Sequence, residues 1–260
     1  QDILIIDADN TGRIKHGCRW MNGLHEFTEL KEGLPIQEQS YTVASISHPS
    51  FFKPYEELYG LTGTLGDQTE RDEIRKMYKL DTFDVPPNRK CQRKRIETLI
   101  VRTDFQKHEI IINKIREITS SQRPILVIVK SIIESQQLSD KLKKKGIHHY
   151  LLNDTQVEDE DFIVDRAGKC GAVTIATNTA GRGTDIRPEK MAIDKGGLHV
   201  ILAFLPINMR DECQGLGRAG RQCQPGSCQI IFSDATFAKD NPVASDEVLN
   251  SVYQKLSNDV

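Results

Sequence analysis

The sequence lacks the features that mark several specialised classes of protein. Its longest apolar runs, at Ile125–Val129 and Leu198–Leu205, fall far short of the ~20 residues that a membrane-spanning helix needs. No Cys-x-x-Cys pair occurs, and six cysteines spread along 260 residues indicate reduced, intracellular thiols rather than a disulfide framework. No charged segment followed by an apolar stretch precedes the first predicted strand, so we expect no secretory signal.

An excess of charge of either sign is also missing. The chain has 35 Lys and Arg against 37 Asp and Glu, a net charge of −2, which argues against a strongly basic nucleic-acid surface. Its 38% of hydrophobic residues is enough for an ordinary core and excludes a disordered chain. Cys213, Cys223 and Cys228 are close in sequence, but no fourth ligand stands at a suitable spacing, so we predict no metal site.

The clearest boundary along the chain is the proline pair that follows Val85, because proline interrupts helix and restricts the residue before it. We expect three parts, at residues 1–84, 85–238 and 239–260, the last a divergent tail with a helix at Ser245–Leu256. Too little strand is predicted before the boundary for that part to fold without a partner surface. The pattern there predicts a strand at Ile3–Ile6, a turn at Asp9–Gly12, and helices at Glu26–Lys31, Pro54–Tyr59 and Glu70–Tyr78.

After the boundary, strands and helices alternate regularly. Such alternation predicts an α/β fold with a parallel sheet covered by helices on both faces. The expected strands are Leu99–Val101, Ile125–Val129, Tyr150–Leu152, Val173–Ala176, Val200–Ala203 and Gln229–Phe232, and the expected helices are Phe105–Thr119, Ile132–Lys145 and Asp159–Ala167.

The helix predicted from Phe105 shows how these helices should pack. Ile111, Ile115 and Ile118 recur at helical spacing and form an apolar stripe that should lie on the sheet. Lys107, Lys114 and Glu117 are expected to point away from it. Ligands of such sheets bind at the carboxyl ends of strands, so chemistry is expected in the loops after Ala176 and Ala203.

The loop after Ala176 contains the string Gly181-Arg182-Gly183-Thr184-Asp185. Glycines on both sides of an arginine allow the backbone to approach a phosphate closely, and Asp185 can accept a hydrogen bond from a ribose hydroxyl or from a partner arginine. A tight strand-to-loop turn explains the same residues equally well. From this stretch alone, both interpretations remain open.

A second cluster runs from Gln214 to Gly226. Arg218 and Arg221 are three residues apart, so on a helix both guanidinium groups would leave the same face and suit bidentate contact with phosphate oxygens. A solvated basic face is the alternative. Gly217 and Gly220 argue against it, since each costs about 1 kcal/mol in a helix relative to alanine and indicates close packing against another domain.

The two clusters, in this order, resemble the late motifs of superfamily 2 helicase-type ATPases, and in detail they resemble the SecA family. The string AVTIATNTAGRGTDI, at residues 172–186, is similar to the SecA motif almost letter for letter. Earlier strings resemble the same family: TGR from Thr11, GLHE from Gly23, LTGT from Leu61 and YKLD from Tyr78. The resemblance covers about residues 3–232.

This resemblance implies a motor that binds ATP with Mg²⁺ between two RecA-like domains and moves unfolded polypeptide. Residues 1–84 would be the carboxyl-side part of the first nucleotide-binding domain and 85–238 the second. Arg218 and Arg221 would act as catalytic arginines. Nucleotide contacts are implied for Gly181, Gly183, Thr184, Asp185 and Gln214, and coupling between domains for Thr62, Gly63 and Thr64. The implied partners are the missing first half, a preprotein and a translocation channel, with the motor in the cytosol and peripheral at a membrane.

Several residues depart from the family pattern. No G-x-x-x-x-G-K-[ST] string and no Asp-Glu pair at a strand end is present, so we expect the chain alone to be inactive as an ATPase. Pro206–Arg210 replaces a polar stretch, Leu216 an arginine and Cys223 a glycine. Two alternatives therefore stay open: a nucleic-acid helicase fragment, and a non-catalytic interaction module derived from the motor fold.

Overall fold

The chain divides into two compact units, Gln1–Asp84 and Val85–Val260, each of which is described by itself. The coordinates are a computed structural model. It describes residues 3–6, 14–15, 17–38, 43–66, 68–153, 160–178, 185–235 and 243–244. The turn expected at residues 9–12 and the helix expected at 245–256 lie outside these ranges.

The first unit contains little sheet, as expected. Strand β1 (Ile5–Ile6) pairs antiparallel with β2 (Ile14–Lys15), and the helices are α1 (Leu24–Lys31), α2 (His48–Phe52) and α3 (Gln68–Tyr78). The helix predicted at Pro54–Tyr59 is wrong. The structure instead places α2 before it, where the Ser47 hydroxyl accepts a hydrogen bond from the Ser50 amide, and Pro54 disfavours helix in the residue that precedes it.

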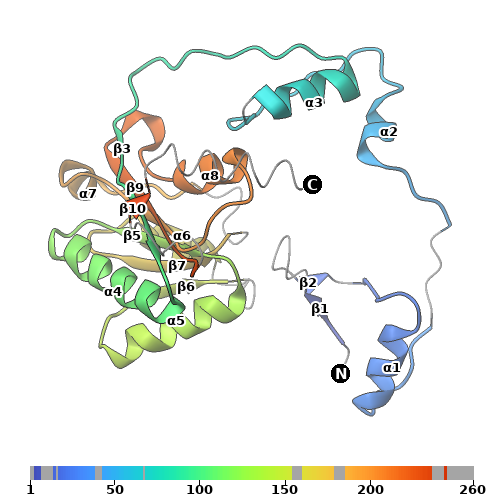
Figure 1. The fold of residues 1–260 in the computed structure, drawn as a ribbon, viewed down its shortest axis with the longest axis horizontal. Helices are drawn as coiled ribbons and strands as arrows, with labels where there is room; N and C mark the ends of the chain where they lie inside the picture. Colours follow the sequence, from blue (N-terminus) through green and yellow to red (C-terminus); the bar gives the residue numbers. More distant parts are fainter. Residues whose placement is uncertain are drawn as a thin grey trace. The chain divides into compact units, whose positions relative to one another are not determined.

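The second unit is built on one sheet of parallel strands (Figure 1). Its order is β10-β4-β9-β8-β5-β7-β6, and among the described strands of this sheet only β10 runs antiparallel, next to β4. The strands are β3 (Arg93–Arg95), β4 (Thr98–Val101), β5 (Ile125–Val129), β6 (Tyr150–Leu152), β7 (Val173–Thr177), β8 (His199–Leu202), β9 (Gly226–Ser233) and β10 (Val243–Ala244).

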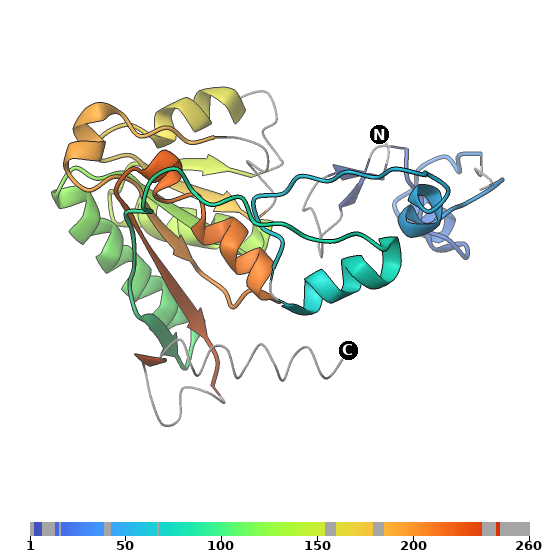
Figure 2. The ribbon, with the colours of Figure 1, turned by 90° about the horizontal axis from the view of Figure 1, so that it is seen from above.

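Strand β9, the long red-brown arrow in Figure 2, organises one side of this sheet. On one edge it pairs with β8. On the other edge it pairs first with β3, in the register Arg93 to Gly226, and then with β4, in the register Leu99 to Ile231. One strand therefore holds two successive strands of the chain.

Helices cover both faces of the sheet, which confirms the predicted α/β fold. Helices α4 (Asp104–Ser120) and α5 (Ile132–Lys144) pack on one face, and α6 (Glu160–Ala167) and α8 (Met209–Leu216) pack on the other. The short α7 (Lys190–Asp194) precedes β8. Alternate residues of β5 enter the two cores, as the two-residue period of a strand requires.

Helix α4 confirms the predicted apolar stripe, because Ile111, Ile115 and Ile118 are buried against the sheet. The expectation for Lys107 was wrong. Its side chain is buried rather than solvated. Its ammonium group forms ion pairs with Asp104 at the start of α4 and with Glu134 at the start of α5. A buried cation with two anionic partners escapes most of the cost of leaving water.

Candidate functional site

The two motifs stand at different ends of their neighbouring strands, because the first follows the carboxyl end of β7 and the second precedes the amino end of β9. Strand β7 ends at Thr177, and the described chain resumes at Asp185. Gly181, Gly183 and Thr184 lie outside the described residues. Asp185 is therefore the part of the first motif whose surroundings the structure gives.

Asp185 bridges two arginines. Its Oδ1 lies 2.8 Å from Nη1 of Arg221, and its Oδ2 lies 3.1 Å from Nε of Arg187. The hydrogen bond from Arg221 is the main cause that lowers the pKa of the Asp185 carboxyl; burial opposes it, and the hydrogen bond from Arg187 lowers the pKa further. The structure thus joins the two predicted motifs by an ion pair between residues 36 positions apart.

The backbone around Asp185 is held by packing. The next residue, Ile186, is buried in the core beneath α6 and α8. Gly168, at the end of α6, lies so close that a Cβ built on it would be 2.0 Å from the carbonyl oxygen of Arg187. Only glycine allows this approach, so the contact fixes where Asp185 and Arg187 leave the core.

The second motif does not form the continuous helix that we expected. Asn208 caps the start of α8 by accepting a hydrogen bond from the Asp211 amide, but the helix ends at Leu216. Gly220 has φ +64°, which a helix does not tolerate, and a short 3₁₀ turn begins at Arg221. Arg218 and Arg221 therefore do not share a helix face. Arg218 is buried, whereas the Arg221 side chain is 41% exposed.

The glycines of this motif pack closely, as expected, but their partner is different. A Cβ on Gly220 would lie 2.9 Å from the Cβ of Arg93 in β3. The expected neighbour was another domain, and the observed one belongs to the same unit. Strand β3 was not predicted, because three consecutive cations show no apolar period.

Two of the departures from the family pattern have a structural explanation. Leu216 is buried in the core under the sheet, so this position faces inward in this chain. Cys223 has φ +59° and Gln222 has φ +55°, in the left-handed region that favours glycine. The glycine usual at position 223 is thus the residue that the backbone prefers.

The remaining predicted residues occupy separate places. Gln214 lies half-buried on α8, two residues before its end. Thr62, Gly63 and Thr64 belong to the first unit, where the Thr64 amide donates a hydrogen bond of 3.2 Å to the Thr62 hydroxyl. The three residues form a hydroxyl-stabilised turn between α2 and α3.

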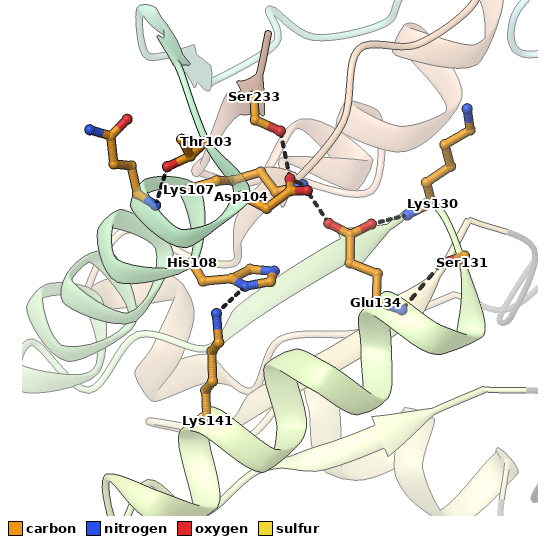
Figure 3. A network of polar contacts seen from close by, with 10 residues as sticks. Thr103, Asp104, Lys107, His108, Lys130, Ser131, Glu134, Lys141 and Ser233 are labelled. Carbon is orange, nitrogen blue, oxygen red and sulfur yellow. Dashed lines mark hydrogen bonds and ion pairs between the residues drawn. The ribbon is translucent and has the colours of Figure 1, made fainter. Parts of the chain in front are cut away.

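A polar cluster that sequence reasoning missed lies at the carboxyl ends of β4, β5 and β9 (Figure 3). Nζ of Lys107 lies 2.6 Å from Glu134 and 2.9 Å from Asp104, and the Ser233 hydroxyl donates to Asp104 at 2.6 Å. The bond from Ser233, followed by that from Lys107, lowers the pKa of the Asp104 carboxyl. These contacts fix the starts of α4 and α5 and the end of β9 relative to one another.

The same cluster continues to His108, whose Nδ1 lies 2.6 Å from Nζ of Lys141 (Figure 3). Burial lowers the pKa of His108, and the neighbouring cations Lys141 and Lys107 lower it further. A neutral imidazole can accept a hydrogen bond from the ammonium group of Lys141. The cluster therefore ties α4 to α5 along their length.

The described residues contain neither a metal-binding cluster nor a membrane-spanning helix. Within the ranges that the structure covers, no group of three or more His, Cys, Asp or Glu side chains is arranged to hold a metal ion. No helix among the described residues has the length and apolar character needed to cross a membrane.

Comparison with known proteins gives the same family for both units. A family model described as the SecA DEAD-like domain matches residues 3–75, and one described as the SecA P-loop domain matches residues 90–192. Protein translocase subunit SecA of Nitratiruptor is 40% identical to this chain, and the match covers 89% of this chain and 26% of the relative. Protein translocase subunit SecA of Desulfovibrio desulfuricans is 41% identical, and the match covers 89% of this chain and 27% of the relative. Subunit SecA 2 of Nitrosospira multiformis is 39% identical over 90% and 34%.

The chain thus spans about a quarter to a third of the length of these relatives. Among solved structures, S. cerevisiae Dbp5 bound to RNA and ADP BeF3 matches with a TM-score of 0.51 and 18% identity, over 75% of this chain and 47% of that chain. At this identity the likeness shows the fold alone, a RecA-like parallel α/β fold. The two family matches and the relatives at about 40% identity agree, and the chain belongs to the SecA family, of whose motor it spans parts of the DEAD-like and P-loop domains.

Proposed function

We propose that this chain supplies the arginine side of the ATP site in a SecA-type motor that moves polypeptide. The observation that carries the proposal is the ion pair between Asp185 and Arg221, which joins the two motifs. Family membership supports a nucleotide as the ligand, and the proposal narrows it to ATP with Mg²⁺.

The residues of this ion pair suit a phosphate. The guanidinium of Arg221 is partly exposed and has a fork of donors that matches phosphate oxygens, while its present partner is another anion, Asp185. Bound ATP would supply the γ-phosphoryl group whose negative charge Arg221 stabilises. Arg218, which is buried, would contact the same phosphate, and Gly181, Gly183, Thr184 and Gln214 would complete the nucleotide contacts.

The chain has no G-x-x-x-x-G-K-[ST] string to hold the β- and γ-phosphates. We therefore propose that this cradle and the Mg²⁺ ligands come from the other half of the motor, and that Thr62, Gly63 and Thr64 couple the two halves. The same proposal gives the motor an unfolded preprotein as substrate, a translocation channel as partner, and a place in the cytosol and at the membrane surface.

The first unit supports the need for a partner half. Its large apolar side chains are mostly exposed, and on α1 the residues Leu24, Phe27 and Leu30 form an exposed row at three-residue spacing. On the opposite side of the helix, His25 and Glu29 are buried beside Arg19. A helix that exposes its apolar row needs another surface to cover it.

The test is ATP turnover by the complete motor protein that contains these 260 residues. We expect Arg221→Ala to lower kcat by a factor on the order of 10³, because removal of an arginine that stabilises the transferred phosphoryl group has effects of about 10³ to 10⁵. The KM for ATP should change far less. Lys144→Ala, which removes an exposed cation on α5, is the control and should turn over ATP normally. Unchanged turnover in Arg221→Ala with an intact fold would leave the non-catalytic module as the better explanation.

A further inference from the structure

We propose that Arg187 is a positioning residue, which keeps Asp185 ion-paired when Arg221 leaves it for the nucleotide. The inference rests on the proposed function, since it gives Asp185 two alternating duties. It concerns a residue outside both predicted motifs.

The geometry separates the two ion pairs. Arg221 contacts Oδ1 of Asp185 through Nη1, and Arg187 contacts Oδ2 through Nε. Each arginine occupies its own carboxylate oxygen, so either one can leave without breaking the contact of the other. A carboxylate has enough acceptor sites for both partners at once.

The backbone shows which arginine stays. Arg187 follows the buried Ile186, and its carbonyl oxygen lies against the backbone of Gly168. The Glu189 amide also donates a hydrogen bond of 3.0 Å to the Gly168 carbonyl oxygen. Residues 185 and 187, on either side of this buried anchor, therefore keep their mutual distance whatever the rest of the site does.

Arg221 stands in a different kind of backbone. Gly220 before it and Gln222 and Cys223 after it all have positive φ, at +64°, +55° and +59°. Such conformations in non-glycine residues store strain and are typical of sites that rearrange. Arg221 is thus the partner suited to move from Asp185 to a phosphate, and Arg187 is the partner suited to stay.

The benefit of this arrangement is electrostatic. If Arg221 left Asp185 alone, an unpaired carboxylate would remain beside the incoming phosphate, and like charges at short range repel. With Arg187 in place, Asp185 keeps a cation, so the transfer of Arg221 costs less.

The first test needs no nucleotide. The pKa of the Asp185 carboxyl is measured by NMR titration in the 260-residue chain and in Arg187→Ala, Arg221→Ala and the double variant. We expect this pKa to be lower in Arg221→Ala than in the double variant, because Arg187 still pairs with the carboxylate when Arg221 is absent. If the pKa is the same in these two variants, Arg187 does not hold Asp185 and the proposal is wrong.

The second test uses turnover by the complete motor. We expect Arg187→Ala to lower kcat about fivefold, a small effect because the Arg187 side chain is 80% exposed. The KM for ATP should change little, and Arg187→Lys should recover part of the loss. Lys190→Ala, an exposed cation three residues on, is the matched control and should leave kcat unchanged. A kcat of Arg187→Ala equal to wild type would overturn the positioning role.

The two proposals fail in different ways. If Arg221 is not a catalytic arginine, Arg221→Ala leaves turnover intact, while the titration still shows whether Arg187 holds Asp185. If only the positioning role is wrong, Arg221→Ala stops turnover and Arg187→Ala does not.

Discussion

His199, at the start of β8, is a buried histidine without a full set of partners. Its side chain is fully buried, and its Nδ1 lies 2.7 Å from the Ser227 hydroxyl. Its Nε2 has no hydrogen-bond partner among the described residues. Burial, aided by the cations Arg123 and Lys114 and opposed weakly by Glu117, lowers the pKa of His199 to about 4.

This depressed pKa makes the fold sensitive to acid. The unfolded chain takes up a proton on His199 near pH 6.5, whereas the folded chain resists until about pH 4. Stability is therefore complete above pH 6.5 and falls as pH decreases to about 4, by about 3 kcal/mol for this residue alone. We expect urea titrations at pH 7 and pH 4.5 to show this loss, and His199→Gln to reduce the difference between the two pH values. An equal loss in both proteins would assign the acid sensitivity to other groups.

The candidate site shows which residues a sequence can reveal. Asp185 and Arg221 could be singled out from the sequence, because an acceptor and a cation beside glycines are typical of phosphate sites. The sequence gives only a weak indication that Arg187 pairs with Asp185. The two residues are two positions apart, which places both on one side of an extended backbone. Lys107 carried none, since only its tertiary contact with Glu134 makes a buried lysine tolerable.

At the scale of elements, β3 is held by its neighbours rather than by its own residues. It is exposed and cationic, but Arg95 forms an ion pair with Glu212 of α8, and the Glu212 side chain is 2% exposed. The pair joins β3 to α8, the helix that precedes the loop of Arg218 and Arg221. A buried carboxylate that loses its cation is strongly destabilising.

We therefore expect Arg95→Ala to lower the free energy of unfolding by about 3 kcal/mol. Lys94→Ala, on the same strand but exposed to solvent, is the matched control and should change it by less than about 0.5 kcal/mol. Denaturant unfolding at neutral pH measures both. Equal, small effects would show that the Arg95 pair contributes as little as an ordinary surface pair.

Most helices and strands of the second unit were predictable to within one to three residues at their ends. Each of these elements has a clear apolar period and packs on a neighbouring element that has one as well. β5 and β6 have the expected bounds, and α4 and α5 differ from them by a residue. The short α7 was missed, since five residues show too little of an apolar period, and α8 ends before the helix that we expected through Arg221. The elements of the first unit were predicted less well, because its described apolar residues are mostly exposed and do not form a local core.

At the scale of the whole molecule, the two units differ in what they bury. Every buried apolar side chain among the described residues except Ile5 belongs to the second unit. The second unit has a core on each face of its sheet, and the described residues of the first unit form none of comparable size. Burial of apolar surface is the main favourable term in folding, so the units should differ in independent stability.

We expect residues 85–260 alone to unfold in one cooperative transition, and residues 1–84 alone to show none. Far-ultraviolet circular dichroism during heating, with amide hydrogen exchange as a second observable, distinguishes the cases. The 260-residue chain is the reference. A cooperative transition for residues 1–84 would show that the exposed apolar row on α1 needs no covering surface.

The place of β3 in the sheet has a mechanical consequence. The peptide that joins the two units runs from Val85 into β3, which is bound in parallel to β9 and packed against Gly220. Tension on this peptide would load that short ladder in shear and reach the loop of Arg221 through the packing of Arg93 on Gly220 and the hydrogen bond from Gln92 to the Cys223 carbonyl oxygen. A force that pulls the two units apart would thus displace the loop of Arg221 before it disturbed the core on either face of the sheet.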